Sequence, residues 1–301
     1  MGYSARILAD SITRSGTRLT TLEAVIPRIV LAELNTHRTH SRCSASSRAI
    51  PVEKRIEMIE RDPFIPETFG KNRKGMQSTE DLDDEAASQA RLIWTNAKTD
   101  AIARARELAK LEVHKQLANR LLEPFAWHTV VLSATEWENF YALRCHPDAQ
   151  GEMRRSAEFM QEAMHNSTPR LLEDGEWHLP YITEEERLTF ELEFLIKVSC
   201  GRCARVSYRT FDGKYDPHAD YILAEKLAEA GHMSPLEHPA RPMTSLELET
   251  YQTFKLDENK RVVPAGSFCG NFRDWIQARK RIRFEHNFAL HQTQAQGEVS
   301  A

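Results

Sequence analysis

The thirteen residues from Thr36 to Arg48 bring imidazole, guanidinium and hydroxyl groups together in one short segment, Thr-His-Arg-Thr-His-Ser-Arg-Cys-Ser-Ala-Ser-Ser-Arg. Arginine side chains bind phosphate oxygens through two parallel hydrogen bonds. Small residues let backbone amides approach the same anion. The segment therefore has the chemistry to hold a planar, phosphorylated ligand.

Two groups of residues also have the spacing of metal ligands. His37 and His40 stand three residues apart, but no glutamate lies between them as in the zinc-protease motif and no third ligand is obvious. A structural role for these histidines, as positive charge at the end of a helix, remains an alternative. Cys200 and Cys203 form a Cys-x-x-Cys pair without a second pair, and we interpret them as small buried residues. We expect no metal site.

The segment needs secondary structure to position it, and the first half of the chain has clear signals. Residues 18–26 favour a strand, and Pro27 suits the first turn of a helix that runs to about Thr39. The other helices expected in this half are a long one over 85–122, broken once, one opened at 135–138 by a capping box and ending near Arg144, and one over 151–166.

The second half of the sequence predicts alternating strands and helices. Asp216 and Pro217 have the residue types of a helix start, and Gly231 has that of a helix end. Ser234 and Glu237 have capping-box spacing. We also expect strands over 188–198 and 246–254 and a basic, aromatic helix over 270–283. The Arg279-Lys280-Arg281 run of this helix is typical of a solvated face.

Bulk properties predict an ordinary globular protein in a reducing cytoplasm. The chain has 301 residues, of which 41% are hydrophobic, and this length allows one large domain or two small ones, of which we expect one domain over 1–301. The net charge of −4 argues against a general nucleic-acid or membrane binder, so any basic site must be local. Five scattered cysteines fit a reducing compartment. We expect a mobile insertion over 60–85 and a frayed tail over 285–301.

The segment that begins at Thr36 also resembles a known signature. Flavin-dependent thymidylate synthases carry Arg-His-Arg, two residues, Ser, one residue, Asn-Glu, one residue, Ser, one residue, Arg. The matching positions here are His37, Arg38, Ser41, Ser46 and Arg48. The family's first Arg and its Asn-Glu pair are replaced by Thr36, Cys43 and Ser44.

Two further blocks resemble the same family. Residues 203–208, Cys-Ala-Arg-Val-Ser-Tyr, and 231–238, Gly-His-Met-Ser-Pro-Leu-Glu-His, are similar to two segments that precede the signature in ordinary members. Residues 120–150, with Arg120, Asn139, Arg144 and Gln150, are similar to the later helices. Because the first two blocks follow the signature here, the chain resembles a circularly permuted, phage-like member.

The resemblance implies an α+β fold with an antiparallel sheet flanked by long helices, and a homotetramer. It implies FAD as cofactor, with methylenetetrahydrofolate and NADPH as co-substrates in the conversion of dUMP to dTMP. The flavin residues carried over are His37, Arg38, Ser41, Asn139, Gln150, Ser207, His232, Ser234 and Glu237. The substrate residues are Arg42, Ser46, Arg48, Arg120 and Arg144, with Arg144 and Arg48 as the catalytic candidates.

The departures from the signature leave alternatives open. Arg42, or an arginine of the basic helix expected at 273–281, is a candidate to replace the arginine lost at Thr36. A flavin-dependent C5 hydroxymethylase or hydroxylase of dUMP or dCMP would reuse the same flavin and pyrimidine site. A non-catalytic protein that binds nucleotide or flavin is an alternative of another class.

Overall fold

The computed structural model describes residues 2–75, 80–206, 216–253, 270–283, 285–287, 289, 291 and 292. Several expectations fall wholly or partly outside the described residues: part of the insertion over 60–85, the end of the 203–208 block with the flavin residue Ser207, the end of the strand at Phe254, and most of the tail over 285–301. Across the described residues, no helix combines the length and the apolar character that a membrane crossing requires.

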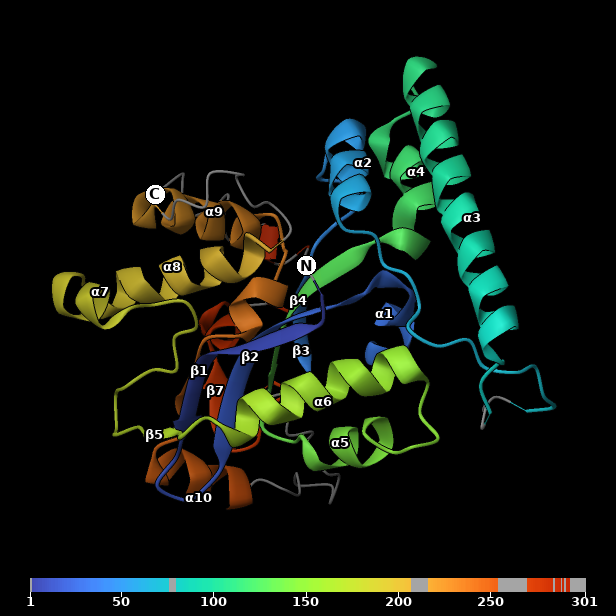
Figure 1. Cartoon of the computed structure of the whole chain (residues 1–301). Coiled ribbons are helices and arrows are strands. Elements are labelled where there is room, and N and C mark those ends of the chain that lie inside the picture. Colours follow the sequence, from blue (N-terminus) through green and yellow to red (C-terminus); the bar gives the residue numbers. More distant parts are fainter. Residues whose placement is uncertain are drawn as a thin grey trace.

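A five-stranded sheet forms the centre of the molecule, in the spatial order β3, β4, β2, β1, β5 (Figure 1). Neighbouring strands are antiparallel, except that the two-residue β5 runs parallel to β1. The strands are β1 (Ser4–Ile12), β2 (Arg18–Pro27), β3 (Ser41–Ser44), β4 (Trp127–Ala134) and β5 (Arg170–Leu171). The expected α+β fold with a largely antiparallel sheet is confirmed.

Both faces of this sheet are covered, as β4 makes clear. Val130 and Leu132 belong to a core cluster with Met153 of α6 (Gly151–His165). The intervening Val131 packs instead with Cys43 and Val206. Successive side chains of a strand point to opposite faces, so β4 has a separate hydrophobic layer on each side. Figure 1 shows α5 (Glu138–Arg144) and α6 along one face.

The remaining elements surround the sheet. Between β2 and β3 come η1 (Arg28–Val30) and α1 (Leu31–Leu34). The second half contains η3 (Ser234–Glu237) and a two-stranded sheet of β6 (Ala240–Pro242) and β7 (Trp275–Gln277). The other helices are α2 (Val52–Arg61), α3 (Asp84–Lys110), α4 (Lys115–Ala118), η2 (Asn119–Phe125), α7 (Glu184–Thr189), α8 (Leu192–Ala204), α9 (Pro217–Glu229), α10 (Ser245–Thr253) and η5 (Ala278–Arg281).

Several expected elements are confirmed with changed limits. The strand over 18–26 is β2, and the long helix over 85–122 is α3, α4 and η2, broken where Glu112 has a φ of 60°. The helix expected from Pro27 to Thr39 ends at Leu34. The Thr36 hydroxyl then donates to the Glu33 carbonyl (2.7 Å), which begins the turn leading into β3.

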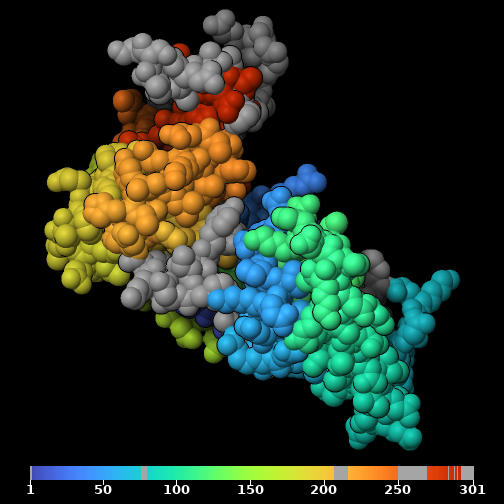
Figure 2. Space-filling model, turned by 90° about the horizontal axis from the view of Figure 1, so that it is seen from above, coloured from blue at the N-terminus to red at the C-terminus, as the bar shows by residue number. Residues whose placement is uncertain are grey.

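The start of the expected mobile insertion belongs to the core. The Phe64 side chain is fully buried and contacts the rings of Trp94 and Trp127 edge-on. Beyond it, Gly70 and Asp81 form an isolated antiparallel bridge. In Figures 1 and 2, α3 forms one end of the molecule, opposite the yellow and orange helices α8 and α9.

Helices α8 and α9 pack against each other at unusually short range. A β-carbon placed on Gly201 of α8 would lie 2.0 Å from the Asp220 carbonyl oxygen and 2.7 Å from the carbonyl carbon. Both atoms belong to the backbone of α9, so no side chain can rotate away to make room. Only glycine permits this approach.

Gly201→Ala should therefore force the two helices apart and lower the free energy of unfolding by about 3 kcal/mol. Urea unfolding followed by circular dichroism measures this loss. Gly151→Ala is the matched control, because Gly151 opens α6 and a β-carbon there meets no atom within 4 Å. Equal stability of the two variants would contradict the close packing of α8 on α9.

Three segments of the second half differ from expectation. The strand expected over 188–198 is wrong, because most of these residues lie in α8, which is buried on several sides and so reads as a continuous apolar run. The strand expected over 246–254 is helix α10, which begins with a reciprocal cap: Glu247 N–H donates to Thr244 Oγ1 (3.3 Å), and Thr244 N–H donates to Glu247 Oε2 (2.8 Å).

The basic helix expected over 270–283 is also wrong, because strand β7 and helix η5 occupy this range. Asp274 has a φ of 63°, which interrupts any helix. The next residues alternate as in a strand: Trp275 and Gln277 are buried, and Ile276 is half-buried.

The two expected capping boxes are absent from their helices. Helix α5 has Trp137 as its N-cap and η3 has Met233, and neither start has a side-chain cap. The Thr135 hydroxyl instead accepts a hydrogen bond from the Arg273 backbone (3.1 Å). The helix expected from Asp216 to Gly231 is confirmed, with the Asp216 carboxylate accepting from His218 N–H (3.0 Å).

Candidate functional site

Strand β3 is the element around which the expected site residues gather. Among the described residues it lies at the edge of the sheet and pairs with β4 alone, so its other side is available to a different element. That element is η3, which contacts β3 although nearly 200 residues separate them in sequence. The loops before and after β3 contain the rest of the signature residues.

The loop before β3 is joined to the end of α5 by Arg144. Its Nε donates to His37 Nε2 (2.8 Å), and one terminal nitrogen donates to Thr36 Oγ1 (3.1 Å). An imidazole nitrogen that accepts a hydrogen bond is unprotonated. Consistently, partial burial and the charges of Arg144 and Arg42 lower the pKa of His37. The structure thus brings two expected site residues, 107 positions apart, into direct contact.

The strand itself is tied to η3 by Gln277. Its side-chain amide donates to Ser41 Oγ (3.0 Å) and to the backbone carbonyl of Glu237 (2.8 Å). Asn271 donates to the same Ser41 hydroxyl (3.2 Å). Two expected flavin residues therefore share one bridging side chain. Sequence analysis missed Gln277, which stood in a segment expected to be helical.

Two charged groups lie beside this bridge. The Arg42 guanidinium donates to the His37 carbonyl (2.9 Å), and burial lowers the pKa of Arg42 while the nearby Glu237 carboxylate opposes that shift. Glu237 is ion-paired with Arg279, which also pairs with Glu285. The interpretation of Arg279 as part of a solvated basic face is therefore wrong.

The last residue of the 231–238 block is built into the core. His238 Nδ1 and the Ser133 hydroxyl are 2.8 Å apart, and Ser133 continues through Thr21 to His178. All four side chains are buried. Burial lowers the pKa of both His178 and His238 to about 3, so both rings are neutral. This chain of polar contacts anchors the end of η3 to the sheet.

The loop after β3 forms a second group of contacts. Ser46 Oγ accepts from the Arg48 backbone (3.3 Å), which shapes the turn. Ser47 donates to the Glu123 carboxylate, and Arg120 donates to the same oxygen (2.9 Å). Arg120, an expected substrate residue of η2, and Ser47 of this loop therefore meet at Glu123, to which sequence analysis assigned no role.

Other expected residues lie on the surface. The side chains of Arg38, Arg48, Asn139, Gln150, His232 and Ser234 are exposed. No side-chain hydrogen bond or ion pair within the described part of the chain joins Asn139 or Gln150 to the residues around β3. Their assignments stay predictions.

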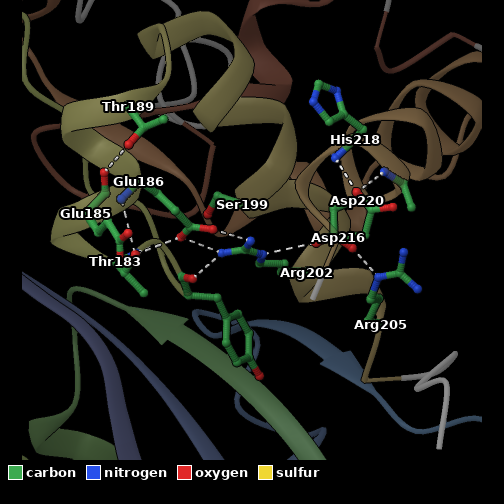
Figure 3. A network of polar contacts seen from close by, with 12 residues as sticks. Thr183, Glu185, Glu186, Thr189, Ser199, Arg202, Arg205, Asp216, His218 and Asp220 are labelled. Atoms are coloured by element: carbon green, nitrogen blue, oxygen red, sulfur yellow. Dashed lines mark hydrogen bonds and ion pairs between the residues drawn. The ribbon is translucent and has the colours of Figure 1, made fainter. Parts of the chain in front are cut away.

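A buried ion network holds the helices that precede η3 (Figure 3). Arg202 lies between Glu186, at 2.5 Å, and Asp220, at 3.0 Å, and Arg205 pairs with Asp220 from the other side. The hydrogen bond from Arg202 is the main cause that lowers the pKa of Glu186 to about 2. Arg205 belongs to the 203–208 block. Its ion pair with Asp220 therefore holds the beginning of that block against α9.

The thiols of the site region are protonated and inaccessible. Burial raises the pKa of Cys43 and of Cys203, and it raises the pKa of Cys200 to about 12. Cys200 and Cys203 are buried, as expected for small apolar residues. Within the described ranges, no group of three or more His, Cys, Asp or Glu side chains is placed to hold a metal ion.

Comparison with solved structures identified several chains of low sequence identity. The UMP/dUMP methylase PolB from Streptomyces cacaoi, bound with 5-Br dUMP, is 19% identical, with a TM-score of 0.41; the match covers 49% of this chain and 66% of PolB. PolB bound with 5-Br UMP is 16% identical, with a TM-score of 0.46 and coverage of 54% and 88%. The flavin-dependent thymidylate synthase ThyX from Helicobacter pylori, complexed with FAD and dUMP, is 21% identical, with a TM-score of 0.31 and coverage of 48% and 67%.

A search among curated proteins gave no match. The family model described as thymidylate synthase complementing protein, Thy1, matches residues 19–170, half of the chain. The matched range contains β2 and β3, the signature residues 37–48, and Arg120 and Arg144, and it ends before the 203–238 blocks. On this match, the chain belongs to the Thy1 family of thymidylate synthase complementing proteins.

Proposed function

We propose that this protein is a flavin-dependent enzyme that transfers a one-carbon unit to C5 of a pyrimidine deoxynucleotide, converting dUMP to dTMP. The observation that carries the proposal is the meeting of separate blocks at β3. His37 contacts Arg144 directly, and Ser41 is linked to Glu237 through Gln277. Residues from three distant parts of the chain thus surround one strand edge.

The groups around β3 fit the chemistry of FAD. A flavin dinucleotide presents a pyrophosphate and a planar ring, and the loop before β3 offers the exposed cation Arg38 beside the half-buried ring of His37. His37, Arg38, Ser41, Glu237, His232 and Ser234 would hold FAD, together with Ser207, Asn139 and Gln150. When bound, FAD supplies the hydride chemistry, with NADPH as the proposed reductant and methylenetetrahydrofolate as the carbon donor.

The arginines of the site would bind and polarise the nucleotide. Arg48, Arg120 and Ser46 are proposed to hold its phosphate and sugar, and Arg42 is proposed to take over from the arginine that Thr36 replaces. Arg144 is proposed to lie against the uracil carbonyls, where a permanent positive charge stabilises the negative charge that develops when the ring is attacked. No covalent cysteine nucleophile is needed, in agreement with the raised pKa of Cys43.

One assay separates this proposal from its alternatives. Purified protein is tested for flavin absorbance, then reduced and incubated with methylenetetrahydrofolate and either dUMP or dCMP, and the product mass is measured. Gain of a methyl group on dUMP supports the proposal. A hydroxymethyl or hydroxyl product would assign the alternative C5 chemistry. Bound flavin or nucleotide without any product would identify a non-catalytic binding protein.

Arg38→Ala should weaken FAD binding roughly ten- to hundred-fold, because it removes a charge-assisted phosphate contact worth about 1.5–3 kcal/mol. Fluorescence titration of the apoprotein with FAD measures the change. Arg104→Ala is the control, since Arg104 is an exposed arginine of α3 that pairs with Glu107. Unchanged FAD affinity in Arg38→Ala would remove Arg38 from the site.

Three features of the architecture are proposed with the function. The 231–238 block reaches β3 from the far end of the sequence, which supports a circular permutation of the family's usual order. We also propose that residues 1–301 act as one domain and assemble as a homotetramer. Analytical ultracentrifugation tests the assembly.

A further inference from the structure

Two arginines contact a single carboxylate beneath the loop that follows β3, and a third lies within electrostatic range of it. The Glu123 carboxylate accepts from Arg120 (2.9 Å) and is paired with Arg28 (3.4 Å). Arg55 of α2 is within electrostatic range of both Glu123 and Arg28. His128 of β4 lies close enough to Arg28 and Arg55 for both charges to act on it. We call Arg28, Arg55, Arg120, Glu123 and His128 the arginine cluster.

Most of the arginine cluster is buried, although the Arg120 side chain is 53% exposed, and the cluster carries excess positive charge. Arg55 is 3% exposed and His128 is 2% exposed. Arg28 and Arg120 both pair with the Glu123 carboxylate, and Arg55 has no ion pair in the described part of the chain, so positive charge exceeds negative charge here. The buried nitrogens Arg28 Nε, Arg55 Nε and His128 Nε2 have no hydrogen-bond partner in the described part of the chain. Burying unpaired charge is costly, so this arrangement is suited to an anionic ligand.

The cluster is continuous with the loop proposed to hold the nucleotide phosphate. Ser47, between Ser46 and Arg48, donates to Glu123, and the Asn119 amide donates to the Ser47 carbonyl (2.7 Å). Glu123 thus receives a hydroxyl and guanidinium donors, the same set of groups that binds a phosphate oxygen.

We propose that the arginine cluster is an anion subsite for the phosphate group of the nucleotide, and that Glu123 occupies the place of a phosphate oxygen in the ligand-free protein. The inference rests on the proposed function for the source of the phosphate. On binding, the phosphate displaces the Glu123 carboxylate from Arg28 and Arg120 and gains Arg55 as a further counter-charge. Glu123 therefore competes with the substrate, whereas Arg55 supports it.

Substitutions of Glu123 and of Arg55 should change the affinity for dUMP in opposite directions. A cluster with a purely structural role would not produce this difference. Glu123→Gln removes the competing charge and should tighten dUMP binding at least about tenfold, while Arg55→Leu should weaken it at least about tenfold. Arg55→Leu should also raise the melting temperature of the ligand-free protein, because it removes a buried unpaired charge. Calorimetric titration and thermal unfolding measure these changes, and Arg55→Gln, which removes the charge but keeps a polar side chain, serves if the leucine variant does not fold.

The ligands identify the source of the anion. Wild type and variants are titrated with dUMP, deoxyuridine and inorganic phosphate, and Arg106→Leu, an exposed arginine paired with Glu53, is the control. Variant effects seen with dUMP but not with deoxyuridine support the proposal. Effects confined to inorganic phosphate would overturn the nucleotide as source. If dUMP binds wild type and all variants equally, the subsite is wrong while the proposed function stands. If wild type binds FAD and yet binds neither dUMP nor phosphate, the subsite and the proposed function are both wrong.

Discussion

Replacing Asp220 by asparagine is expected to lower the free energy of unfolding by about 3–5 kcal/mol. Asp220 is fully buried and accepts from Arg202 (3.0 Å) while pairing with Arg205. Arg202 itself is only 3% exposed. Removing the negative charge leaves two guanidiniums facing a neutral amide at a place that water does not reach. Urea unfolding followed by circular dichroism gives the change in free energy.

The control for this substitution lies on the same two helices. Glu225→Gln breaks the ion pair between Glu225 of α9 and Lys197 of α8 (2.5 Å), whose side chains are 40% and 42% exposed. Exposed pairs contribute little, so this variant should stay within about 1 kcal/mol of wild type. A loss in Asp220→Asn no larger than that in Glu225→Gln would mean that the network in Figure 3 does not stabilise the fold.

Arg144→Ala is expected to reduce turnover of dUMP by roughly 10²–10³-fold, the effect of losing one pre-organised donor to a developing negative charge. The half-buried guanidinium is held in place by His37 and Thr36, so it is already oriented before substrate binds. Arg144→Lys should recover only part of the activity, because a single ammonium cannot reproduce the two-pronged contact. Initial rates of product formation, measured by mass spectrometry, test this.

Arg154→Ala provides the comparison for Arg144. Arg154 lies on α6, is 40% exposed and pairs with Glu158 on the same helix. It should retain near wild-type turnover. Circular dichroism of both variants checks that the fold persists. If Arg144→Ala keeps more than a tenth of the activity while folded, Arg144 does not stabilise the reacting ring.

The sequence was sufficient for elements defined by local chemistry. Helix α9 begins at Asp216 and Pro217 and is followed by Gly231, because an N-cap carboxylate, a proline at N1 and a glycine with positive φ each act over a few residues. The signature residues 37–48 were recognisable for a similar reason. Ligand contacts concentrated in one loop leave a dense pattern of residue types.

Local patterns failed where burial or strand pairing decided the structure. Helix α8 is apolar on several sides because it packs in the interior, so its sequence resembles that of a buried strand. The segment at Trp275 is polar and basic like a helix, but pairing with β6 makes it a strand. The Ser234–Glu237 spacing suits a capping box, yet contacts with β3 and α8 leave it as a short 3-10 helix.

The sequence therefore predicts only some of the residues that contribute to the site. Residue types and spacing identified His37, Arg144 and Glu237 as candidates, because guanidinium, imidazole and carboxylate groups have specific chemistry. Only the tertiary structure revealed that Gln277 links Ser41 to Glu237 and that Glu123 pairs with two arginines, with Arg55 in electrostatic range. Such contacts join residues up to 236 positions apart. They depend on how strands and helices pack, and packing is a property of the whole chain rather than of any segment.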